Sequence, residues 1–272
     1  MPELPEVETT INGIKPYVLK QTILKAIIRQ PQLRWPISAN TADALKGKQI
    51  QNVSRRGKYI LIQTNHGTIL IHLGMSGRLS IMPVASSPGK HDHIDIQVNE
   101  QNLLRYTDPR RFGAFLWLNS PSILQHPLLR NLGIEPFDSD FDGDYLLQKA
   151  VKKTLAIKSF IMDQRIVVGV GNIYATEALF MANIHPATPS KLISIDQMHD
   201  LTYAIKNLLK DAIQAGGTSL KDFLNVNGNP GSFKFHLQIY DRQGQPCPEC
   251  DTTIEKIIIN QRSSCFCPSC QI

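Results

Sequence analysis

The spacing of apolar residues changes from a helical to a strand period near the start of the chain. Apolar positions three and four residues apart predict a buried N-terminal helix with an inner face of Val7, Ile11, Ile14 and Val18. Short apolar or alternating runs then predict strands at 23–28, 59–63, 68–73, 93–98, 103–107 and 114–118. Since the connections are mostly brief, with one short helix near 41–45, the pattern favours a β-sandwich.

The second half of the chain returns to the helical period. It begins after a stretch rich in Pro, Gly, Asp and Asn at 119–144, which predicts a domain connection. Helices are expected at 145–151, 159–162 and 173–182. Ser194 and Gln197 resemble a capping box at the start of the longest helix, which two glycines end at 216–217. Together the two halves predict an α+β protein.

All five cysteines lie after position 246, which indicates one local site in a reducing compartment rather than disulfides across the fold. Four of them form two pairs, with two residues inside each pair and sixteen between the pairs: Cys247 and Cys250, then Cys267 and Cys270. Tetrahedral zinc in four-cysteine ribbons has this ligand spacing. The sequence therefore predicts one structural Zn²⁺, with Cys265 outside the pairing as a spectator thiol.

Two short runs between the cysteine pairs, at 253–259 and 263–266, predict a hairpin with its turn at 260–262. This prediction places Arg262 on an exposed tip. An arginine in a turn is often only solvated. A guanidinium on a tip can also enter a phosphate-lined cleft, because its planar fork matches phosphate oxygens.

The composition is that of a soluble globular protein of two domains, with 272 residues, 42% hydrophobic and 19% charged. The net charge of +6 and the pI near 9.0 favour a polyanionic partner. The start has no basic segment followed by an apolar stretch, and no run of about 18 apolar residues occurs. We therefore expect a cytoplasmic protein without membrane contact.

Pro2 becomes an unusual nucleophile if Met1 is removed, because its nitrogen is then a free secondary amine. An α-amine has a reference pKa of about 7.7 to 8.0, against about 10.4 for lysine, so more of it is unprotonated near neutral pH. Its attack on a sugar aldehyde carbon gives an iminium that stays cationic and withdraws electrons from neighbouring bonds. Glu3 supplies an acid beside that nitrogen. In an arbitrary protein the same residues would more often be a solvated helix start.

Basic residues gather before two predicted strands, at 55–58 (Arg-Arg-Gly-Lys) and 108–113 (Asp-Pro-Arg-Arg-Phe-Gly). Such clusters can hold phosphates and push an aromatic side chain into a base stack, although each alone also fits a solvated sheet edge. Met75 on a glycine-flanked loop fits either a wedge or core filler. The glycines before Asn172 fit phosphate binding at a helix start, but they lack the third glycine of a dinucleotide fingerprint, so we exclude a nucleotide cofactor.

Seven motifs in order along the chain together resemble formamidopyrimidine-DNA glycosylase, a family of bifunctional base-excision repair enzymes. They are Pro2-Glu3-Leu4-Pro5-Glu6, Arg56-Gly57-Lys58-Tyr59, His72-Leu73-Gly74-Met75-Ser76-Gly77, Lys90-His91-Asp92-His93, Asp108-Pro109-Arg110-Arg111-Phe112-Gly113, Gly169-Val170-Gly171-Asn172-Ile173-Tyr174, and the four-cysteine finger with Gln261-Arg262. The resemblance implies a catalytic β-sandwich domain with flanking helices at 1–130, a helix-two-turns-helix domain at 131–232 and a zinc finger at 233–272. It also implies a monomer at the nucleoid of the bacterial cytoplasm. Its partner would be double-stranded DNA, from which an oxidised purine such as 8-oxoguanine or formamidopyrimidine is flipped.

The resemblance also assigns roles by position. Pro2 would attack the sugar C1′ carbon and form a Schiff base, while Glu3 would donate protons during base loss and ring opening. Lys58 would assist β-elimination and bind phosphate, and Arg262 would serve δ-elimination. DNA contacts are expected from His72, Met75, His91, Arg110, Phe112, Lys153 and Asn172. Among these, Met75, Arg110 and Phe112 would fill the gap left by the flipped base, and a mobile loop within 216–230 would cover the damaged base.

Two other functions stay open as alternatives. An endonuclease VIII-like glycosylase would share the chemistry but prefer oxidised pyrimidines; Leu4 resembles the purine-specific branch, since the pyrimidine-specific relative usually has Gly there. A non-catalytic DNA-binding module would keep the fold and the finger. The joint presence of the four residues with catalytic roles argues against such a module.

Overall fold

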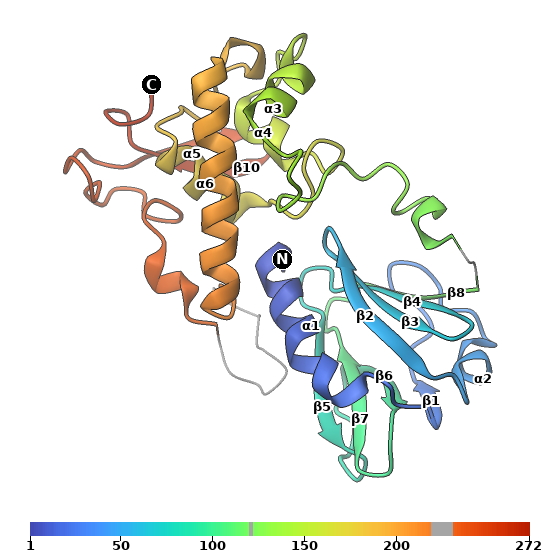
Figure 1. The fold of residues 1–272 in the computed structure, drawn as a ribbon. Coiled ribbons are helices and arrows are strands. Elements are labelled where there is room, and N and C mark those ends of the chain that lie inside the picture. The colour runs from blue at the N-terminus through green and yellow to red at the C-terminus, as the bar shows by residue number, and fades with distance from the viewer. Residues whose placement is uncertain (120–121, 219–230) are drawn as a thin grey trace. The chain divides into compact units, whose positions relative to one another are not determined.

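The computed structural model describes residues 1–119, 122–218 and 231–272 (Figure 1). They separate into two compact units. Unit 1 comprises Met1–Arg130 with Ala215–Ser232, and unit 2 comprises Asn131–Gln214 with Phe233–Ile272. The expected division into three domains stays a prediction. In the part of the chain that the structure describes, no helix has the length and apolar character needed to cross a membrane.

Unit 1 begins with helix α1 (Leu4–Val18), which confirms the helix expected from the apolar spacing. The Glu3 N–H donates to the Glu6 carboxylate at 2.7 Å, as in one half of a capping box. Pro5 also lies in the first turn, where its missing N–H costs little. The face of α1 that carries the predicted apolar positions is buried, which anchors the start of the chain on the unit's core.

Two four-stranded antiparallel sheets form the body of unit 1. The first has the order β1 (Lys25–Ile28), β6 (Asp92–Gln97), β7 (Asn102–Thr107), β5 (Arg78–Pro83), and the second has the order β2 (Ile50–Arg56), β3 (Tyr59–Thr64), β4 (Gly67–His72), β8 (Ala114–Leu118). Apolar side chains from both sheets and from α1 share one buried cluster, so the sheets pack face to face. This confirms the predicted β-sandwich, which is flanked by α1 and the short helix α2 (Thr41–Leu45).

Strands β2 and β5 are not among those predicted from the sequence. Each lies at the edge of its sheet and has few buried positions. In β2 only Ile50 and Val53 are buried, and in β5 only Leu79. Strand β2 is mostly polar and so lacks the apolar run that identifies a central strand, whereas β5 has a short apolar set, Leu79, Ile81 and Met82, that Ser80 interrupts.

Unit 2 contains four α-helices, α3 (Gly143–Ala150), α4 (Ile157–Met162), α5 (Asn172–Met181) and α6 (Ile195–Gln214), and ends in the hairpin β9 (Glu255–Ile259) and β10 (Arg262–Phe266). The predicted capping box at the start of α6 is present, with hydrogen bonds of 3.0 and 3.2 Å between Ser194 and Gln197. Helix α5 is buried almost all round, because it contacts α4, α6 and β10. The final hairpin is therefore packed on the helices of its own unit.

Candidate functional site

The N-terminal residues Pro2 and Glu3 lie buried at the beginning of α1. Glu3 is 3% exposed, whereas the preceding Met1 is 52% exposed. The Glu6 carboxylate accepts backbone hydrogen bonds from Glu3 N at 2.7 Å and from Thr218 N at 2.8 Å. Glu6 thus joins the backbone beside Pro2 to a segment 212 positions later in the chain.

Glu6 is a site residue that sequence reasoning missed, because it was named only as a member of the first motif and no role in the site was assigned to it. Its distance of three residues from Glu3 is capping-box spacing and could have identified the first of its two contacts. No local pattern predicts the second contact, which reaches Thr218. The covering loop was expected within 216–230. Its first residues, 216–218, are among the described residues, and 219–230 lie outside them.

Lys58 lies in the tight turn between β2 and β3, beside α1. Gly57 takes a φ of +56° in this turn, which closes the pair Arg56–Tyr59. The Arg55 Nε donates to the Glu8 carboxylate at 2.9 Å and so fastens the hairpin to α1. Glu8 is six residues from the second position of the chain, about 9 Å along a helix. The hairpin therefore holds Lys58, which is 8% exposed, near the first turns of α1.

His72 is uncharged at neutral pH. Burial, with the nearby charges of Lys58 and Arg34, lowers the pKa of His72 to about 4. Its Nδ1 accepts the Gly74 N–H at 3.0 Å, so the neutral ring carries its proton on Nε2. His72 can therefore act on DNA as a neutral hydrogen-bond donor and not as a cation.

Two loops carry the residues expected to fill the base stack. We call residues 73–77 the Met75 loop and residues 108–113 the Phe112 loop. A Cβ on Gly74, whose φ is +65°, would lie 2.6 Å from backbone atoms of both Phe112 and Gly113, so the loops touch through this glycine. Met75 is 38% and Phe112 48% exposed, and the Arg110 guanidinium lies 4.8 Å from the Phe112 ring centre. The structure therefore brings these three predicted residues together on one surface.

The buried Asp108 carboxylate fastens these loops to each other. Its Oδ1 accepts from Ser76 Oγ at 2.6 Å, and its Oδ2 accepts from Tyr106 OH at 3.2 Å and Gly113 N at 2.9 Å. The Ser76 hydroxyl in turn accepts the Arg110 N–H at 3.2 Å. Because Asp108 is fully buried, these bonds are shielded from water and hold both loops in one arrangement.

Replacing Asp108 should cost stability in proportion to the donors it leaves unpaired. We expect Asp108→Ala to lower the free energy of unfolding by about 2–4 kcal/mol, since each buried donor without an acceptor costs about 1–3 kcal/mol. Asp108→Asn should lose less, because its amide oxygen can still face Tyr106 and Gly113. Urea unfolding of both variants measures the difference. Equal losses of unfolding free energy in the two variants would contradict the role given to Asp108 Oδ2 as acceptor from Tyr106 and Gly113.

Two further residues expected to contact DNA lie at element boundaries of unit 2. Asn172 is the first residue of α5, after the N-cap Gly171, and its Oδ1 is buried without a hydrogen-bond partner among the described residues. Lys153 is exposed, and its carbonyl oxygen accepts from Ser190 Oγ at 3.1 Å and Lys191 N at 3.0 Å. This fixed backbone presents the Lys153 ammonium at the surface, where it can meet a phosphate.

The four paired cysteines form a compact metal site at the end of unit 2. Their sulfur atoms all lie within 4.8 Å of one another, with separations of 3.3 Å for Cys250–Cys270, 3.5 Å for Cys250–Cys267 and 3.9 Å for Cys247–Cys270. Tetrahedral zinc with Zn–S bonds of about 2.3 Å requires sulfur separations of about 3.8 Å. The site thus holds one structural zinc, as predicted. Cys265 lies outside the ligand set, buried in the small apolar cluster of the finger.

Arg262 begins strand β10 instead of lying within the turn, which corrects the predicted position by one residue. The turn consists of Asn260 and Gln261, both with positive φ, and Arg262 pairs with Ile259. The buried Lys158 supports the two residues after Arg262. Its Nζ donates to the Ser263 carbonyl at 2.9 Å and to Ser264 Oγ at 2.8 Å. Arg262 is exposed on a rigidly supported hairpin. Lys158 was missed, since nothing in its local sequence distinguishes it.

Glu177 connects α5 to the segment before the finger and was also missed. Its carboxylate accepts backbone N–H bonds from Gln238 at 2.9 Å, Ile239 at 3.0 Å and Tyr240 at 2.6 Å. Burial raises the pKa of Glu177, and the three N–H donors only partly offset this effect. The helix that begins at Asn172 is therefore fastened to the base of the finger.

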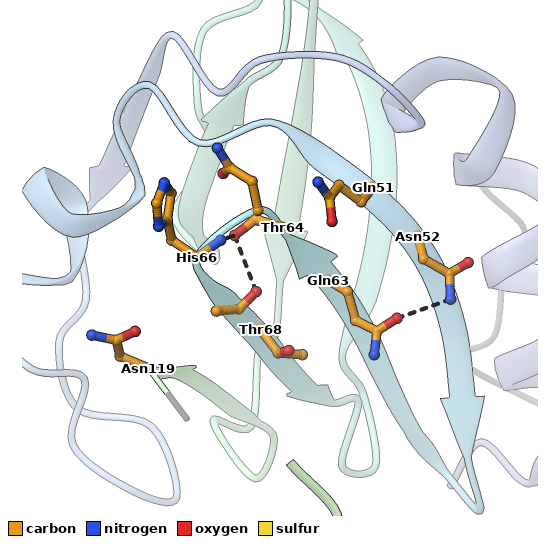
Figure 2. Close-up of a pocket in the computed structure, with 9 residues that line it drawn as sticks. Gln51, Asn52, Gln63, Thr64, His66, Thr68 and Asn119 are labelled. Carbon is orange, nitrogen blue, oxygen red and sulfur yellow. Dashed lines mark hydrogen bonds between the residues drawn. The ribbon is translucent and has the colours of Figure 1, made fainter. Parts of the chain in front are cut away.

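A polar pocket of about 500 Å³ lies at the β3–β4 turn of unit 1 (Figure 2). It is at the opposite end of β3 from Lys58, about 20 Å away along the strand. It is lined mainly by Gln, Asn and Thr side chains together with His66, and one hydrogen bond of 2.9 Å joins Asn52 to Gln63 across it. Because no lysine or arginine is among the residues that line it, this pocket does not suit a DNA phosphate, so we leave it outside the candidate site.

Three family models match the chain in sequence. They are the formamidopyrimidine-DNA glycosylase N-terminal domain at residues 1–115, the formamidopyrimidine-DNA glycosylase H2TH domain at residues 132–224, and a zinc finger found in FPG and IleRS at residues 244–272. A formamidopyrimidine-DNA glycosylase of Legionella pneumophila is 51% identical over 271 residues, which is 100% of this chain and 98% of the relative.

Solved structures of the Lactococcus lactis protein have the same fold. A point mutant of that FPG in complex with Fapy-dG-containing DNA aligns with a TM-score of 0.92 at 32% identity, covering 99% of each chain. The wild-type FPG in complex with DNA containing an oxidised pyrimidine aligns with a TM-score of 0.91 at 32% identity, again covering 99% of each chain. The likeness spans both units and all three segments matched by the family models.

Proposed function

Because the chain belongs to the formamidopyrimidine-DNA glycosylase family, it is a DNA repair glycosylase that acts on damaged bases, and we propose that its substrates are oxidised purines in duplex DNA. We further propose that it cleaves through a Schiff base at Pro2 and then cuts the strand by β- and δ-elimination. The observation that carries this proposal is the buried terminus. Pro2 and Glu3 are fixed by Glu6 at the start of α1, with the Lys58 hairpin fastened to the same helix.

The chemistry begins with removal of Met1, because an amide nitrogen has no nucleophilic lone pair. The freed Pro2 nitrogen attacks C1′ of the flipped nucleotide, and the bond between C1′ and the base breaks as Glu3 supplies a proton. The sugar ring then opens to a cationic iminium. This cation acidifies the C2′ protons, so the 3′ phosphate leaves with Lys58 assisting, and the 5′ phosphate follows with Arg262. One nucleophile thus serves both strand cuts.

The exposed apolar and cationic residues of unit 1 fit the space left by the flipped base. Base extraction leaves a gap in the stack and an unpaired partner base. Met75 and Phe112 present apolar surface for that gap, and Arg110, stacked against Phe112, would face the orphaned cytosine. Asp108 holds the two loops in contact, so the three residues can enter the duplex together.

Binding should weaken steeply with salt, because several cationic side chains meet phosphates. If Lys58, Lys153 and Arg262 neutralise phosphates, while His91 and Asn172 contact the backbone by hydrogen bonds, the logarithm of the binding constant should fall linearly with the logarithm of salt concentration, by about 0.9 per neutralised phosphate. Titration of a labelled duplex between about 50 and 200 mM salt measures this slope. A flat response would show that the basic clusters do not bind phosphates.

Borohydride trapping tests the proposal directly. Reduction of the iminium should give a covalent complex with duplex DNA that contains 8-oxoguanine, provided that mass spectrometry shows Pro2 as the first residue. A chain that retains Met1 is the matched control and should give no complex. Absence of trapping by protein with a verified Pro2 terminus would contradict the Schiff base mechanism.

Repeating the trap with a panel of lesions tests the substrate. The Lactococcus lactis complex with an oxidised pyrimidine is the observation that keeps pyrimidine lesions as a second candidate class. Leu4 favours the purine class, so trapping should be faster with 8-oxoguanine and formamidopyrimidine than with oxidised pyrimidines. The reverse order would assign the chain to pyrimidine repair. For the intact protein we propose a monomer that acts on nucleoid DNA in the bacterial cytoplasm.

A further inference from the structure

The Arg105 guanidinium, beside the loop that carries Lys90 and His91, uses all of its hydrogen-bond donors. Arg105 is in β7 and is 3% exposed. It makes hydrogen bonds to Asp95 Oδ1 (2.8 Å), Asp95 Oδ2 (2.9 Å), Asp92 Oδ2 (3.4 Å) and the carbonyl oxygens of Ser87 (3.1 Å) and Ser86 (3.0 Å). A guanidinium has five N–H donors, so these bonds occupy all of them. Two go to the backbone of the loop itself.

The same network fastens the loop at its far end. Asp92 Oδ2 also accepts the Gly89 N–H at 2.8 Å, and its Oδ1 accepts from Thr107 Oγ1 at 2.5 Å. The His91 carbonyl accepts the Asp108 N–H at 3.1 Å. We call segment 86–92 the His91 loop. Hydrogen bonds therefore fix this loop before Lys90, at the His91 carbonyl and at Asp92. Its Lys90 is exposed, and its His91 is half-buried.

The charges of this network, buried at Arg105 and Asp95 and partly exposed at Arg29 and Asp92, balance one another. Arg29 Nη2 donates to Asp95 Oδ2 at 2.6 Å, so two arginines face two aspartates. Burial alone would raise the pKa of Asp95, but hydrogen bonds from Arg105 and Arg29 outweigh it and hold that pKa below its usual range. Asp95 is therefore ionised at neutral pH, and the network adds no net charge under the His91 loop.

Stability alone does not explain so many buried charges. Replacing a buried ion pair by apolar residues of similar volume is often neutral or stabilising, because desolvation offsets the attraction. Apolar residues could not, however, bond the carbonyls of Ser86 and Ser87 in fixed directions. We propose that Arg105 is a positioning residue for DNA binding, which holds the His91 loop so that His91 meets a phosphate of the DNA. This inference rests on the proposed function, because the phosphate contact of His91 is part of it.

A double-mutant cycle with His91→Ala separates this role from a general loss of stability. Arg105→Lys keeps the charge beside Asp95 but has no fork to reach both loop carbonyls. Arg105→Lys should weaken binding to a duplex with a tetrahydrofuran abasic analogue by about tenfold, as expected for a residue that acts through another. The rate of trapping at saturating 8-oxoguanine DNA should change less than about twofold, since chemistry is untouched. The double variant should bind no more weakly than His91→Ala alone.

Arg29→Lys is the control, because Arg29 shares Asp95 and bonds the loop backbone only at its last residue, through the Asp92 carbonyl at 3.4 Å, and bonds neither Ser86 nor Ser87. Its affinity should stay within about twofold of the wild type. Unchanged affinity of folded Arg105→Lys, or losses that add to those of His91→Ala, would overturn the inference. If Arg105→Lys does not fold, Asp92→Asn takes its place under the same criteria. A wild-type protein that neither binds nor traps damaged DNA would instead overturn the proposed function.

Discussion

Glu3→Gln is expected to lose base excision while it still cuts DNA at an abasic site formed beforehand. The amide cannot donate a proton to the departing base, and removal of a general acid costs about 10²- to 10⁴-fold in rate. At an existing abasic site no base has to leave, and the Pro2 amine can still form the Schiff base. Single-turnover rates on an 8-oxoguanine duplex and on an abasic duplex measure the two activities separately.

The matched control is Glu100→Gln, which makes the same chemical change at an exposed position between β6 and β7. Both of its rates should equal those of the wild type. Glu3 is buried at the N-cap of α1, so the folded state of the variant is checked by thermal unfolding. An equal loss of both activities in folded Glu3→Gln would contradict the role of Glu3 in base release and would indicate general damage to the site.

The local patterns of the sequence predicted the elements that have many buried positions and the metal site. Helix α1 has an apolar face of regular period, and the central strands have continuous apolar runs, so both could be recognised without their neighbours. The zinc ligands were predicted because the two cysteine pairs have the spacing of ligands that a hairpin brings together around one zinc. Strand β2 was missed because its edge position allows polar residues on most of its length, and β5 because Ser80 interrupts its short apolar set.

The residues that position the site were the part that sequence reasoning did not find. Glu6 and Thr218 are 212 residues apart, and Lys158 and Ser263 are 105 apart. Each contact depends on the folded path of the chain, and either partner alone has an ordinary local sequence. Asp108 was quoted as part of a motif, yet its hydrogen bonds to Ser76 and Gly113 become visible only when both loops are placed. Motifs thus predict which residues carry the chemistry, and those roles stay predictions, whereas the residues that support them could not be predicted in this way.

Loss of the structural zinc is expected to unfold the finger and with it the support of Arg262. The apolar cluster of the finger consists of Phe180, Ile239 and Ile254 with cysteine side chains, which is too small to hold the hairpin alone. Metal binding in zinc-finger peptides contributes about 10 to 16 kcal/mol, so most of the folding free energy of this segment depends on the ion. Cys267→Ser should therefore lower the zinc content well below one per chain. It should also abolish δ-elimination and weaken DNA binding.

Cys265→Ala is the control that makes this test specific, because Cys265 is buried beside the ligands but lies outside the ligand set. It should keep one zinc per chain and the activity of the wild type, with a modest loss of stability from the smaller side chain. Metal content by elemental analysis and product analysis on an abasic duplex distinguish the variants. If Cys267→Ser lost only δ-elimination and stopped at the β-elimination product without weaker DNA binding, only the role of Arg262 would depend on the finger. If Cys265→Ala lost zinc while Cys267→Ser kept it, the ligand assignment would be wrong.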